Sequence, residues 1–260
     1  QEIQRSAQLT ILDRFTKIHG VGPTIAQHWY DLGLVSLGDL EEAASQGIIR
    51  LQHDQIVGIK YYEDFQKPIP RGDVDHILQI VKNHCSTIFG DLVMVEMTGG
   101  YRRGKLLNGD ADILIHPVRK GASKGDILDK LVKALKDAGY VKDILSISKS
   151  TSDGKGRAKK IDGLDLCYMA FKPTSDSPIR RVDLIVAGRQ AYPFAQLGWT
   201  GSRQFERSLR LYCSRERGLT LTDHGLTMTG NEQEVGEFAC EREIFEYLGV
   251  TFQEPSERNC

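Results

Sequence analysis

Apolar and polar residues alternate in two different rhythms along the chain. Up to about residue 66, apolar positions recur every three or four residues, which predicts a series of short amphipathic helices. The first of these, LTILDRFTKI, carries apolar side chains at helical spacing at Leu9, Ile11, Leu12, Phe15 and Ile18. The segment KPIPRGD (67–73) then breaks the pattern with two prolines and a glycine, and therefore predicts a linker.

The middle of the chain changes to the two-residue rhythm of β-strands. After a helix from about Asp73, four segments have strand character: LVMVEMT, DADILIHP, DLCYMAF and RRVDLIVA. A second helix, DILDKLVKALKDAG, lies among them and ends at Gly139, a residue typical of a C-terminal cap. These elements predict a mixed sheet with helices on one side.

The last part of the chain, from about residue 191, is predicted to be a small mixed unit. It contains one long amphipathic helix, SRQFERSLRLYCSRERG, followed by short β-like pieces and a helical CEREIFEYLG. The fold class expected for the whole chain is α+β. We expect three domains: a helical one over residues 1–69, a mixed sheet over 70–189 and a small α+β unit over 190–260.

Composition narrows the choice of function only slightly. The chain has 260 residues, of which 40% are hydrophobic and 27% charged, an ordinary globular composition. Its net charge is −1, so any binding to nucleic acid has to rest on local basic patches. The five cysteines lack zinc-ligand spacing and are expected to be reduced thiols. We expect no signal peptide and no membrane span, and the polar start without Met suggests an excised fragment.

Three aspartates on two predicted strands are the strongest candidates for chemistry. Strand alternation places Asp110 and Asp112 on one face, with Cα atoms about 7 Å apart. The same alternation in RRVDLIV places Arg181 and Asp183 on one face. If the two strands are neighbours, three carboxylates converge beside an arginine, a set suited to two Mg²⁺ ions and in-line phosphoryl displacement. Taken alone, an Asp-x-Asp would more often be a solvated strand edge or a turn.

The segment before the first aspartate has the composition of an anion site. Gly99-Gly100 allows backbone amides to approach a phosphate closely. Arg103 can fork onto phosphate oxygens, and Lys105 adds a point charge. Asn108-Gly109 permits a tight turn that returns the chain to the aspartates. The alternative, an exposed basic turn, does not explain why glycines stand on both sides.

With these residues the chain resembles the family X DNA polymerases, in the group of polymerase lambda, polymerase mu and terminal deoxynucleotidyltransferase. The motifs that carry the resemblance are GGYRRGKLLNGDAD, RRVDLIV, LGWTGSRQFERSLR and the closing FQEPSERN. The resemblance covers nearly the whole chain. It corresponds to the fingers, palm and thumb of the family, without its lyase and BRCT domains.

This resemblance implies a fold and an activity. The fold is a nucleotidyltransferase palm, preceded by a helical fingers subdomain and followed by a thumb. The activity is that of a DNA-directed DNA polymerase that adds nucleotides to a DNA 3′-OH with release of pyrophosphate. It would act in short-gap filling and double-strand-break end joining. The alternatives are a template-independent terminal transferase and, in another class, a catalytically inactive DNA-end-binding scaffold.

The resemblance also implies roles for individual residues. Asp110, Asp112 and Asp183 are the expected catalytic ligands of Mg²⁺, for which Mn²⁺ can substitute. The expected nucleotide-binding residues are Gly99, Gly100, Arg103, Lys105, Asn108, Gly109, Gly198, Trp199, Thr200, Gly201 and Glu206. The expected DNA contacts are Arg181, Arg203, Arg207 and Arg210.

Two of these positions have alternative interpretations. Trp199 could be an ordinary core residue, but its place between Gly198 and a Thr-Gly-Ser turn favours a nucleotide platform. Gly198 stands where a tyrosine of related polymerases would crowd a ribose 2′-OH, so weak discrimination against ribonucleotides is expected. The arginines at 203, 207 and 210 share one helix face, which in most proteins is only a solvated face.

The segment IHGVGPTIAQHWYDLG predicts a helix-hairpin-helix that binds DNA. Gly20 and Gly22 allow backbone amides to reach a DNA phosphate, and the second helix offers its N-terminus near Thr24. The resemblance implies that backbone carbonyls of the hairpin bind Na⁺ or K⁺, at Thr16, Ile18 and Val21. The alternative is a plain αα-hairpin, and His19 is interpreted as a turn residue rather than a metal ligand.

The expected partners follow from the same resemblance. They are DNA as primer-template, gap or broken end, deoxynucleoside triphosphates and, given Gly198, ribonucleoside triphosphates. We expect a nuclear monomer that reaches end-joining factors through a region outside this chain. The basic loop from Ser148 to Lys160 is expected to help bridge broken ends, unless it is only the tip of a hairpin.

Overall fold

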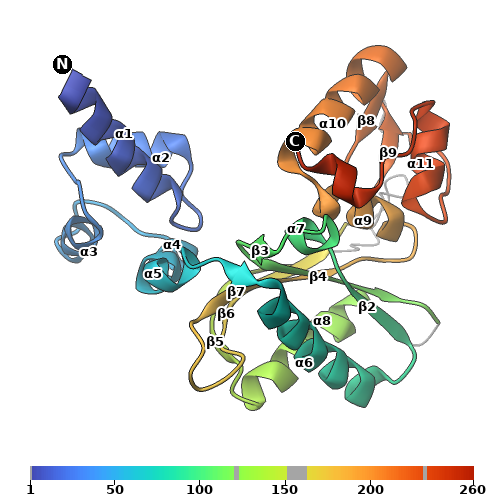
Figure 1. Ribbon diagram of the computed structural model, residues 1–260, viewed down its shortest axis with the longest axis horizontal. Helices are drawn as coiled ribbons and strands as arrows, with labels where there is room; N and C mark the ends of the chain where they lie inside the picture. Colours follow the sequence, from blue (N-terminus) through green and yellow to red (C-terminus); the bar gives the residue numbers. More distant parts are fainter. Residues whose placement is uncertain (1, 120–122, 151–162, 231–232) are drawn as a thin grey trace.

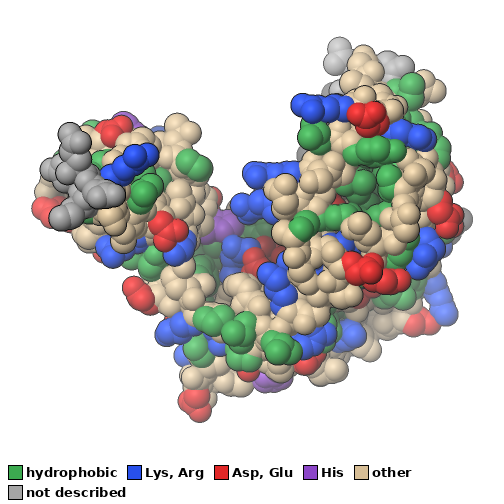
Figure 2. Space-filling view, turned by 45° about the horizontal axis from the view of Figure 1, so that its top comes forward, with side chains coloured by type: hydrophobic (Ala, Val, Ile, Leu, Met, Phe, Trp, Pro, Cys, Tyr) green, Lys and Arg blue, Asp and Glu red, His purple; other side chains and the backbone are tan. Residues whose placement is uncertain are grey.

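The computed structural model describes residues 2–119, 123–150, 163–230 and 233–260, which form three units (Figure 1). A helical unit and a C-terminal unit stand as two arms on the same side of a central unit built on a sheet. Figure 2 shows the molecule with the top of Figure 1 brought forward. In this view the surface is hollowed between the arms, and Lys and Arg side chains gather along the hollow. None of the described helices is long and apolar enough to cross a membrane.

The helical unit contains the predicted series of short helices. These are α1 (Glu2–Thr16), α2 (Pro23–Asp31), α3 (Leu37–Ser45), α4 (His53–Lys60) and α5 (Tyr62–Phe65). Their core is built around Phe15, whose ring meets that of Trp29 edge-on at 5.8 Å. Ser36 caps α3 by accepting a hydrogen bond from the amide of Asp39. Leu9 departs from the expected core, because it lies on the outer side of α1 and is 60% exposed.

The central unit contains a mixed five-stranded sheet, counted over the described residues, with the strand order β2-β4-β7-β6-β5. The strands are β2 (Val93–Met97), β4 (Ala111–Pro117), β5 (Val141–Ser148), β6 (Asp165–Phe171) and β7 (Arg180–Val186). β4 and β7 are parallel, and the other neighbouring pairs are antiparallel. The predicted mixed sheet is therefore confirmed. β5 was not predicted, because two shifts of register with β6 interrupt its alternation of apolar and polar residues.

Helices α6 (Arg71–Phe89) and α8 (Lys124–Asp137) cover one face of the sheet with a continuous apolar core. The residues expected to face a helix layer, such as Ile113 and Leu184, lie in that core. Gly139 follows α8 with a φ of 81°, the left-handed conformation expected just after a helix end. The predicted linker is more ordered than expected, since β1 (Ile69–Pro70) pairs with β3 (Leu107–Asn108) before α6 begins.

The C-terminal unit combines helices with a small hairpin. Its elements are α9 (Tyr192–Thr200), α10 (Arg203–Arg217), β8 (Leu219–Leu221), β9 (Leu226–Met228), α11 (Glu241–Leu248) and a final 3₁₀ turn (Pro255–Arg258). Apolar side chains of α9, α10 and α11, among them Phe194, Leu209 and Phe245, form its core. Because α9 also packs on Leu114 and Ile185, this unit covers part of the second face of the sheet.

Polar contacts fix the helical unit against the edge of the sheet. The Nζ atom of Lys60 lies 2.7 Å from a carboxylate oxygen of Asp143, which also accepts a hydrogen bond from the hydroxyl of Tyr61. The Nε2 atom of His53 lies 2.8 Å from the carbonyl oxygen of Ile144, which is within hydrogen-bonding distance. These contacts join α4 to β5, so the predicted DNA-binding hairpin is held at a defined place relative to the sheet.

The greater part of the basic loop, residues 151–160, lies outside the described residues. Its expected role in bridging broken ends therefore stays a prediction.

Candidate active site

The three candidate aspartates lie together where β4 runs beside β7. Parallel pairing places Asp112 directly opposite Asp183, and Asp110 stands just before β4. One carboxylate oxygen from each of the three lies within 4.8 Å of the others. This closeness confirms the convergence predicted from strand alternation. The apolar residues that alternate with the aspartates point to the opposite face and pack against α6 and α8.

Burial and mutual repulsion make this cluster easy to protonate. Asp183 is 3% exposed and Asp112 is 9% exposed. Burial, followed by the charges of Asp110 and Asp183, raises the pKa of Asp112 well above its ordinary value. Burial also raises the pKa of Asp183 to about 7, although the charge of Arg181 opposes the shift.

Arg181 is the positive group between the carboxylates. Its Nε atom lies 3.2 Å from Asp183, and its Nη2 atom donates to Asp110. Burial lowers the pKa of Arg181, but the three aspartates outweigh that effect and raise it above the ordinary value. A single guanidinium among three carboxylates leaves negative charge in excess. Buried oxygen donors with excess negative charge are the ligands that divalent cations such as Mg²⁺ prefer.

A cavity of about 550 Å³ lies between the central unit and the C-terminal unit, beside the aspartates. It is bounded by the cluster, by the short helix α7 (Gly99–Arg102) and by α9 and α10. The lining residues are Gly99, Gly100, Arg103, Asp110, Asp112, Gly198, Trp199, Gly201, Arg203, Glu206, Arg207, Arg210 and Asp223. Most of the predicted nucleotide-binding and DNA-binding residues of the central and C-terminal units therefore line one cavity.

The first two positions of α7 need glycine, because neighbouring side chains lie too close to leave room for a Cβ atom. Gly99 has a φ of 56°, and a Cβ there would collide with the carboxylate of Asp112. A Cβ on Gly100 would lie 2.7 Å from the amide oxygen of Asn108. Asn108 is buried and, among the described residues, its amide has no hydrogen-bond partner. It stands behind the glycine wall rather than on the cavity surface.

Not every predicted nucleotide-binding residue reaches the cavity. Lys105 and Gly109 are exposed outside its lining, and Gly109 does not adopt the left-handed conformation. Thr200 is buried at the end of α9, where its hydroxyl donates to the carbonyl of Gln196 and accepts from Arg102. A nucleotide-binding role for these residues stays a prediction.

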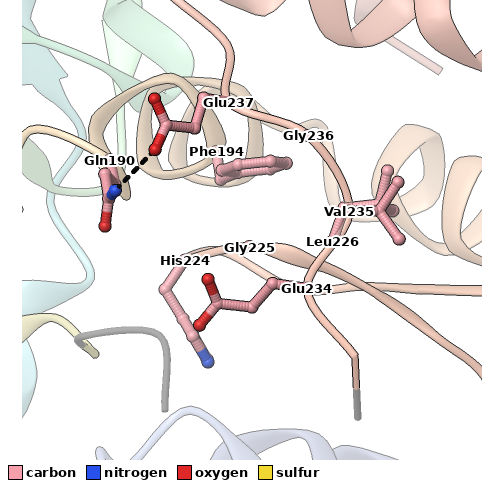
Figure 3. A pocket seen from close by; sticks show the side chains of 9 residues that line it. All are labelled: Gln190, Phe194, His224, Gly225, Leu226, Glu234, Val235, Gly236 and Glu237. Atoms are coloured by element: carbon pink, nitrogen blue, oxygen red, sulfur yellow. Dashed lines mark hydrogen bonds between the residues drawn. The ribbon is translucent and has the colours of Figure 1, made fainter. Parts of the chain in front are cut away.

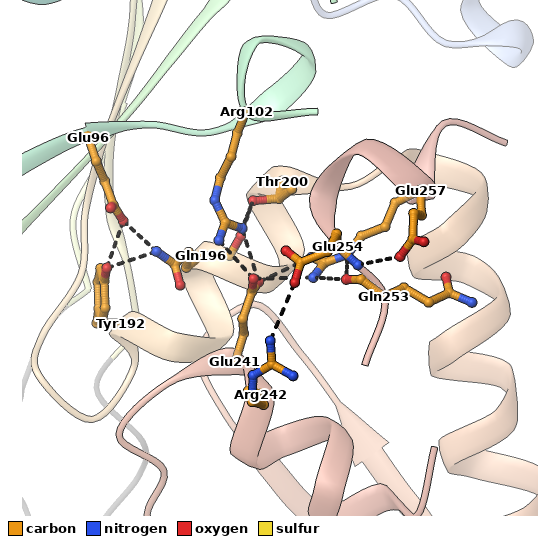
Figure 4. A network of polar contacts seen from close by, with 11 residues as sticks. Glu96, Arg102, Tyr192, Gln196, Thr200, Glu241, Arg242, Gln253, Glu254 and Glu257 are labelled. Carbon is orange, nitrogen blue, oxygen red and sulfur yellow. Dashed lines mark hydrogen bonds and ion pairs between the residues drawn. The ribbon is translucent and has the colours of Figure 1, made fainter. Parts of the chain in front are cut away.

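Arg102 joins α7 to the C-terminal unit through a buried carboxylate. Its guanidinium donates to both oxygens of Glu241, at 2.7 and 3.1 Å (Figure 4). Arg258, which is fully buried, donates to the same two oxygens at 3.1 and 3.2 Å and also to the carbonyl of Gln253. Although burial opposes the shift, hydrogen bonds from the two arginines lower the pKa of Glu241.

Arg103 strengthens the same connection from the next position in the chain. Its guanidinium donates to the carbonyl of Thr200 and, at 2.9 Å, to the side chain of Asn259. The amide of Asn259 donates back to the Arg103 carbonyl at 3.0 Å. Contacts with Thr200 and Asn259 of the C-terminal unit thus orient Arg103, the candidate phosphate-binding arginine. Arg103 also lines the cavity.

Trp199 and Gly198 lie at the end of α9, on the cavity wall. Trp199 is partly exposed there, which favours the platform interpretation over a core residue. Gly198 lies against Asp223, since an added Cβ would stand 3.2 Å from the Asp223 Cβ. Asp223 was not identified from the sequence, because a single aspartate in a polar turn carries no distinguishing pattern. Its carboxylate lies 2.8 Å from Nδ1 of His224.

Helix α10 presents its two faces as its amphipathic pattern predicts. Arg203, Arg207 and Arg210 line the cavity, whereas the apolar side chains pack in the core of the C-terminal unit. Glu206 lies among these arginines and is only 7% exposed. Burial raises its pKa, while Arg210, 3.5 Å away, opposes the shift.

The predicted helix-hairpin-helix is formed by α1, a tight turn and α2. Gly22 and Thr24 are exposed at the start of α2, where backbone amides can reach a ligand. Gly20 has a φ of 78° and packs instead against Asp54, and its carbonyl accepts a hydrogen bond from Gln55. Of the three residues expected to bind a monovalent cation, Thr16 ends α1, and Ile18 and Val21 lie in the turn itself. The cation itself stays a prediction.

A second pocket lies in the C-terminal unit, away from the aspartates (Figure 3). Phe194, His224 and Glu234 are among its lining residues, and Gln190 donates to Glu237 across its rim at 3.1 Å. Its volume of about 30 Å³ matches roughly one water molecule. It is therefore too small to compete with the larger cavity as a substrate site.

Comparison with known proteins assigns all three units to one family. Residues 13–66 match the fingers domain of DNA polymerase lambda, residues 68–189 the DNA polymerase beta palm, and residues 195–259 the DNA polymerase beta thumb. The DNA-directed DNA/RNA polymerase mu of Homo sapiens is 32% identical over 276 residues, covering 100% of this chain and 54% of the relative.

Two further relatives have similar identity. The DNA nucleotidylexotransferase of Xenopus laevis is 32% identical over 99% of this chain and 54% of its own length. The DNA polymerase lambda of Rattus norvegicus is 32% identical over 98% of this chain and 43% of its own length. The chain thus spans about half the length of the curated relatives that it matches. With matching fingers, palm and thumb, and with the acidic cluster in place, the chain belongs to the family X DNA polymerases.

Proposed function

We propose that this chain is the catalytic core of a DNA-directed DNA polymerase that adds nucleotides to a DNA 3′-OH. The observation that carries the proposal is the cluster of three carboxylates, two of them buried, beside a glycine-arginine segment that lines the same cavity as Asp110 and Asp112. The carboxylates suit divalent cations, and the segment suits a triphosphate.

The donor chemistry of the acidic cluster fits the metal that this family needs. Asp110, Asp112 and Asp183 would hold two Mg²⁺ ions, or Mn²⁺ in their place, because each offers carboxylate oxygens to a shared position. When bound, such ions lower the pKa of the attacking hydroxyl and neutralise negative charge on the triphosphate.

The residues of the chain then supply orientation and electrostatic stabilisation. Arg103 and the amides of Gly99 and Gly100 hold the triphosphate, while Arg181 keeps Asp110 and Asp183 in place. The primer 3′ oxygen forms a bond to the α-phosphorus. The bond between the α-phosphorus and the oxygen that bridges it to the β-phosphate breaks at the same time. Pyrophosphate leaves, and the hydroxyl proton passes to solvent.

The DNA is expected to lie in the hollow between the arms. Arg203, Arg207 and Arg210 give this surface positive charge although the whole chain carries −1 (Figure 2). At the other arm, the exposed start of α2 would contact the backbone of one strand. A Na⁺ or K⁺ ion held by carbonyls near Thr16, Ile18 and Val21 would be shared with the same strand.

The cellular role proposed here is short-gap filling and the joining of broken ends in the nucleus, as a monomer recruited by end-joining factors. The names of the relatives support the nucleotide-adding activity behind this role, since they are a DNA-directed DNA/RNA polymerase, a DNA polymerase and a DNA nucleotidylexotransferase. The name of polymerase mu includes RNA synthesis, and Gly198 on the cavity wall has no side chain that could exclude a ribose 2′-OH, so we include ribonucleotides among the substrates.

Primer extension with Mg²⁺ on gapped, single-stranded and broken-end DNA tests this proposal. The wild type should extend primers in gaps, and Asp183→Asn should reduce kcat by about 1,000-fold or more. The matched control is Asp91→Asn, which changes an exposed aspartate paired with Arg119. DNA binding without any extension would support an inactive scaffold. Extension on single strands alone would support a terminal transferase.

A further inference from the structure

Tyr168 stands in line with the aspartates on the same face of the sheet. In antiparallel β6 and β7 it is the direct partner of Asp183, which in turn lies opposite Asp112 on β4. Directly paired side chains share a face, with Cβ atoms about 4.5–5.5 Å apart. The strand order therefore gives a row of Asp112, Asp183 and Tyr168, with the tyrosine on the side away from the glycine-arginine segment.

Tyr168 is also the middle of an aromatic row that joins the two arms. Its ring lies 5.5 Å from the ring of His19, at the turn of the helix-hairpin-helix. On its other side it lies 6.4 Å from the ring of Trp199, on the cavity wall. The base of the tyrosine packs with the apolar cluster of Val57 and Leu145, while the side chain remains partly exposed. Its position is therefore fixed from three directions.

The geometry of phosphoryl transfer indicates what lies over this ring. Attacking and leaving oxygens occupy opposite sides of the phosphorus in an in-line displacement. The glycines and Arg103 line the cavity on the side of Asp112, so the triphosphate and its leaving group lie there. The attacking 3′-OH must then approach from the side of Asp183. Tyr168 lies next along the face, between Asp183 and the hairpin that would hold the strand further upstream.

Resting on the proposed function, we propose that Tyr168 positions the primer, with its ring packed against the sugar and base of the 3′-terminal nucleotide. His19 restrains the ring from the hairpin side, so the strand would pass over two aromatic side chains between the hairpin and the metal ligands. An aromatic ring on a base contributes binding free energy irrespective of sequence. This role requires the ring and not the hydroxyl, because stacking on a base uses only the aromatic face.

Steady-state kinetics with a gapped primer-template separate this role from a structural one. We compare Tyr168→Phe, which keeps the ring, with Tyr168→Leu, which keeps only apolar bulk. The expected result is near-normal behaviour for the phenylalanine variant. For the leucine variant we expect primer KM and DNA Kd to rise on the order of tenfold, with nucleotide KM within twofold. The matched control is Tyr140→Leu, which removes a ring stacked on Phe171 within the opposite core and should lower only Tm.

The outcomes are distinct. Loss of primer binding with nucleotide KM preserved and rescue by phenylalanine supports the proposal. Equal primer KM in the leucine variant and the wild type, or a parallel rise of primer and nucleotide KM with lowered Tm, would overturn it. If the wild type extends no primer at all, the polymerase proposal itself fails. That result differs from a Tyr168→Leu variant whose primer KM equals that of an active wild type.

Discussion

At the scale of single residues, the acidic cluster is an arrangement that is unfavourable without cations. Asp112 and Asp183 are buried beside each other and beside Asp110, and one arginine compensates them only in part. Their pKa values rise as a result, that of Asp183 to about 7. A site so arranged gives up stability in the metal-free state in exchange for strong affinity for divalent cations.

The raised pKa values predict how Mg²⁺ binding depends on pH. Because the folded pKa of Asp183 lies above its unfolded value, the metal-free protein binds extra protons between about pH 4 and pH 7 and loses stability as pH rises through that window. Protons compete with Mg²⁺ over the same range. The increase in Tm produced by Mg²⁺ should therefore be larger at pH 8 than at pH 6. An equal increase at both pH values, or the same pH dependence in Asp183→Asn, would contradict this account.

Gly198 leads to a prediction about sugar selection. Gly198 lies on the cavity wall against Asp223 and has no side chain of its own to exclude a ribose 2′-OH. The preference in kcat/KM for a deoxynucleotide over its ribonucleotide should stay below about 1,000-fold, near 4 kcal/mol. Gly198→Ala should increase this preference, whereas Gly72→Ala, where a Cβ meets nothing within 4 Å, should not. A wild-type preference well above that limit would show that another group excludes the 2′-OH.

At the scale of secondary-structure elements, α7 is held to the thumb by a buried three-residue network. Glu241 accepts hydrogen bonds from Arg102 on the palm side (Figure 4). It also accepts hydrogen bonds from Arg258 near the C-terminus. Since α7 carries the glycines and precedes Arg103, this network also fixes the phosphate-binding segment relative to the end of α9. The two domains thus meet through charge rather than through an apolar interface at this point.

Breaking this network should affect both stability and nucleotide binding. Glu241→Gln removes the charge that compensates the fully buried Arg258, a change that costs about 3–5 kcal/mol in comparable buried pairs. We expect a lower free energy of unfolding in urea and a higher nucleotide KM. The control Glu246→Gln changes an exposed glutamate on the same helix. A stable Glu241→Gln variant with normal nucleotide KM would show that the network does not position α7.

The sequence predicts these elements unevenly, for physical reasons. The face of each aspartate follows from the two-residue period of a strand, so the convergence of Asp110, Asp112 and Asp183 required only that β4 and β7 be neighbours. β5 was missed because its register shifts disturb that period. Tyr168 was missed because its ring meets His19 and Trp199, which belong to units far apart in the chain, and no local pattern records such contacts. Asp223 was missed because a single aspartate in a polar turn has no distinguishing pattern.

At the scale of the whole molecule, a protein that is nearly neutral overall presents a locally basic hollow. The net charge of −1 hides the Lys and Arg side chains that gather between the arms (Figure 2). The arginines of α10, Arg203, Arg207 and Arg210, line the cavity. The contacts of Lys60 and Tyr61 with Asp143 keep the other arm at a fixed place on the sheet edge. The distance between the predicted DNA-binding hairpin and the acidic cluster is therefore set by folded structure rather than by a flexible linker.

The basic hollow predicts a salt-dependent affinity for DNA. The logarithm of the DNA association constant should fall linearly with the logarithm of salt concentration, and Arg207→Ala should reduce the slope by about 0.9 for one lost phosphate contact. Arg215→Ala is the matched control, because Arg215 lies on the same helix outside the cavity lining. Fluorescence anisotropy with gapped DNA measures both slopes. Identical slopes for the wild type and Arg207→Ala would place the DNA elsewhere.

The measurement that tests the central claim most directly is anomalous diffraction from crystals soaked in Mn²⁺ with gapped DNA and a non-hydrolysable nucleotide. The account predicts manganese between the carboxylates of Asp110, Asp112 and Asp183, with the triphosphate extending toward Arg103. Manganese bound elsewhere, or a nucleotide bound with the three carboxylates unligated, would contradict it.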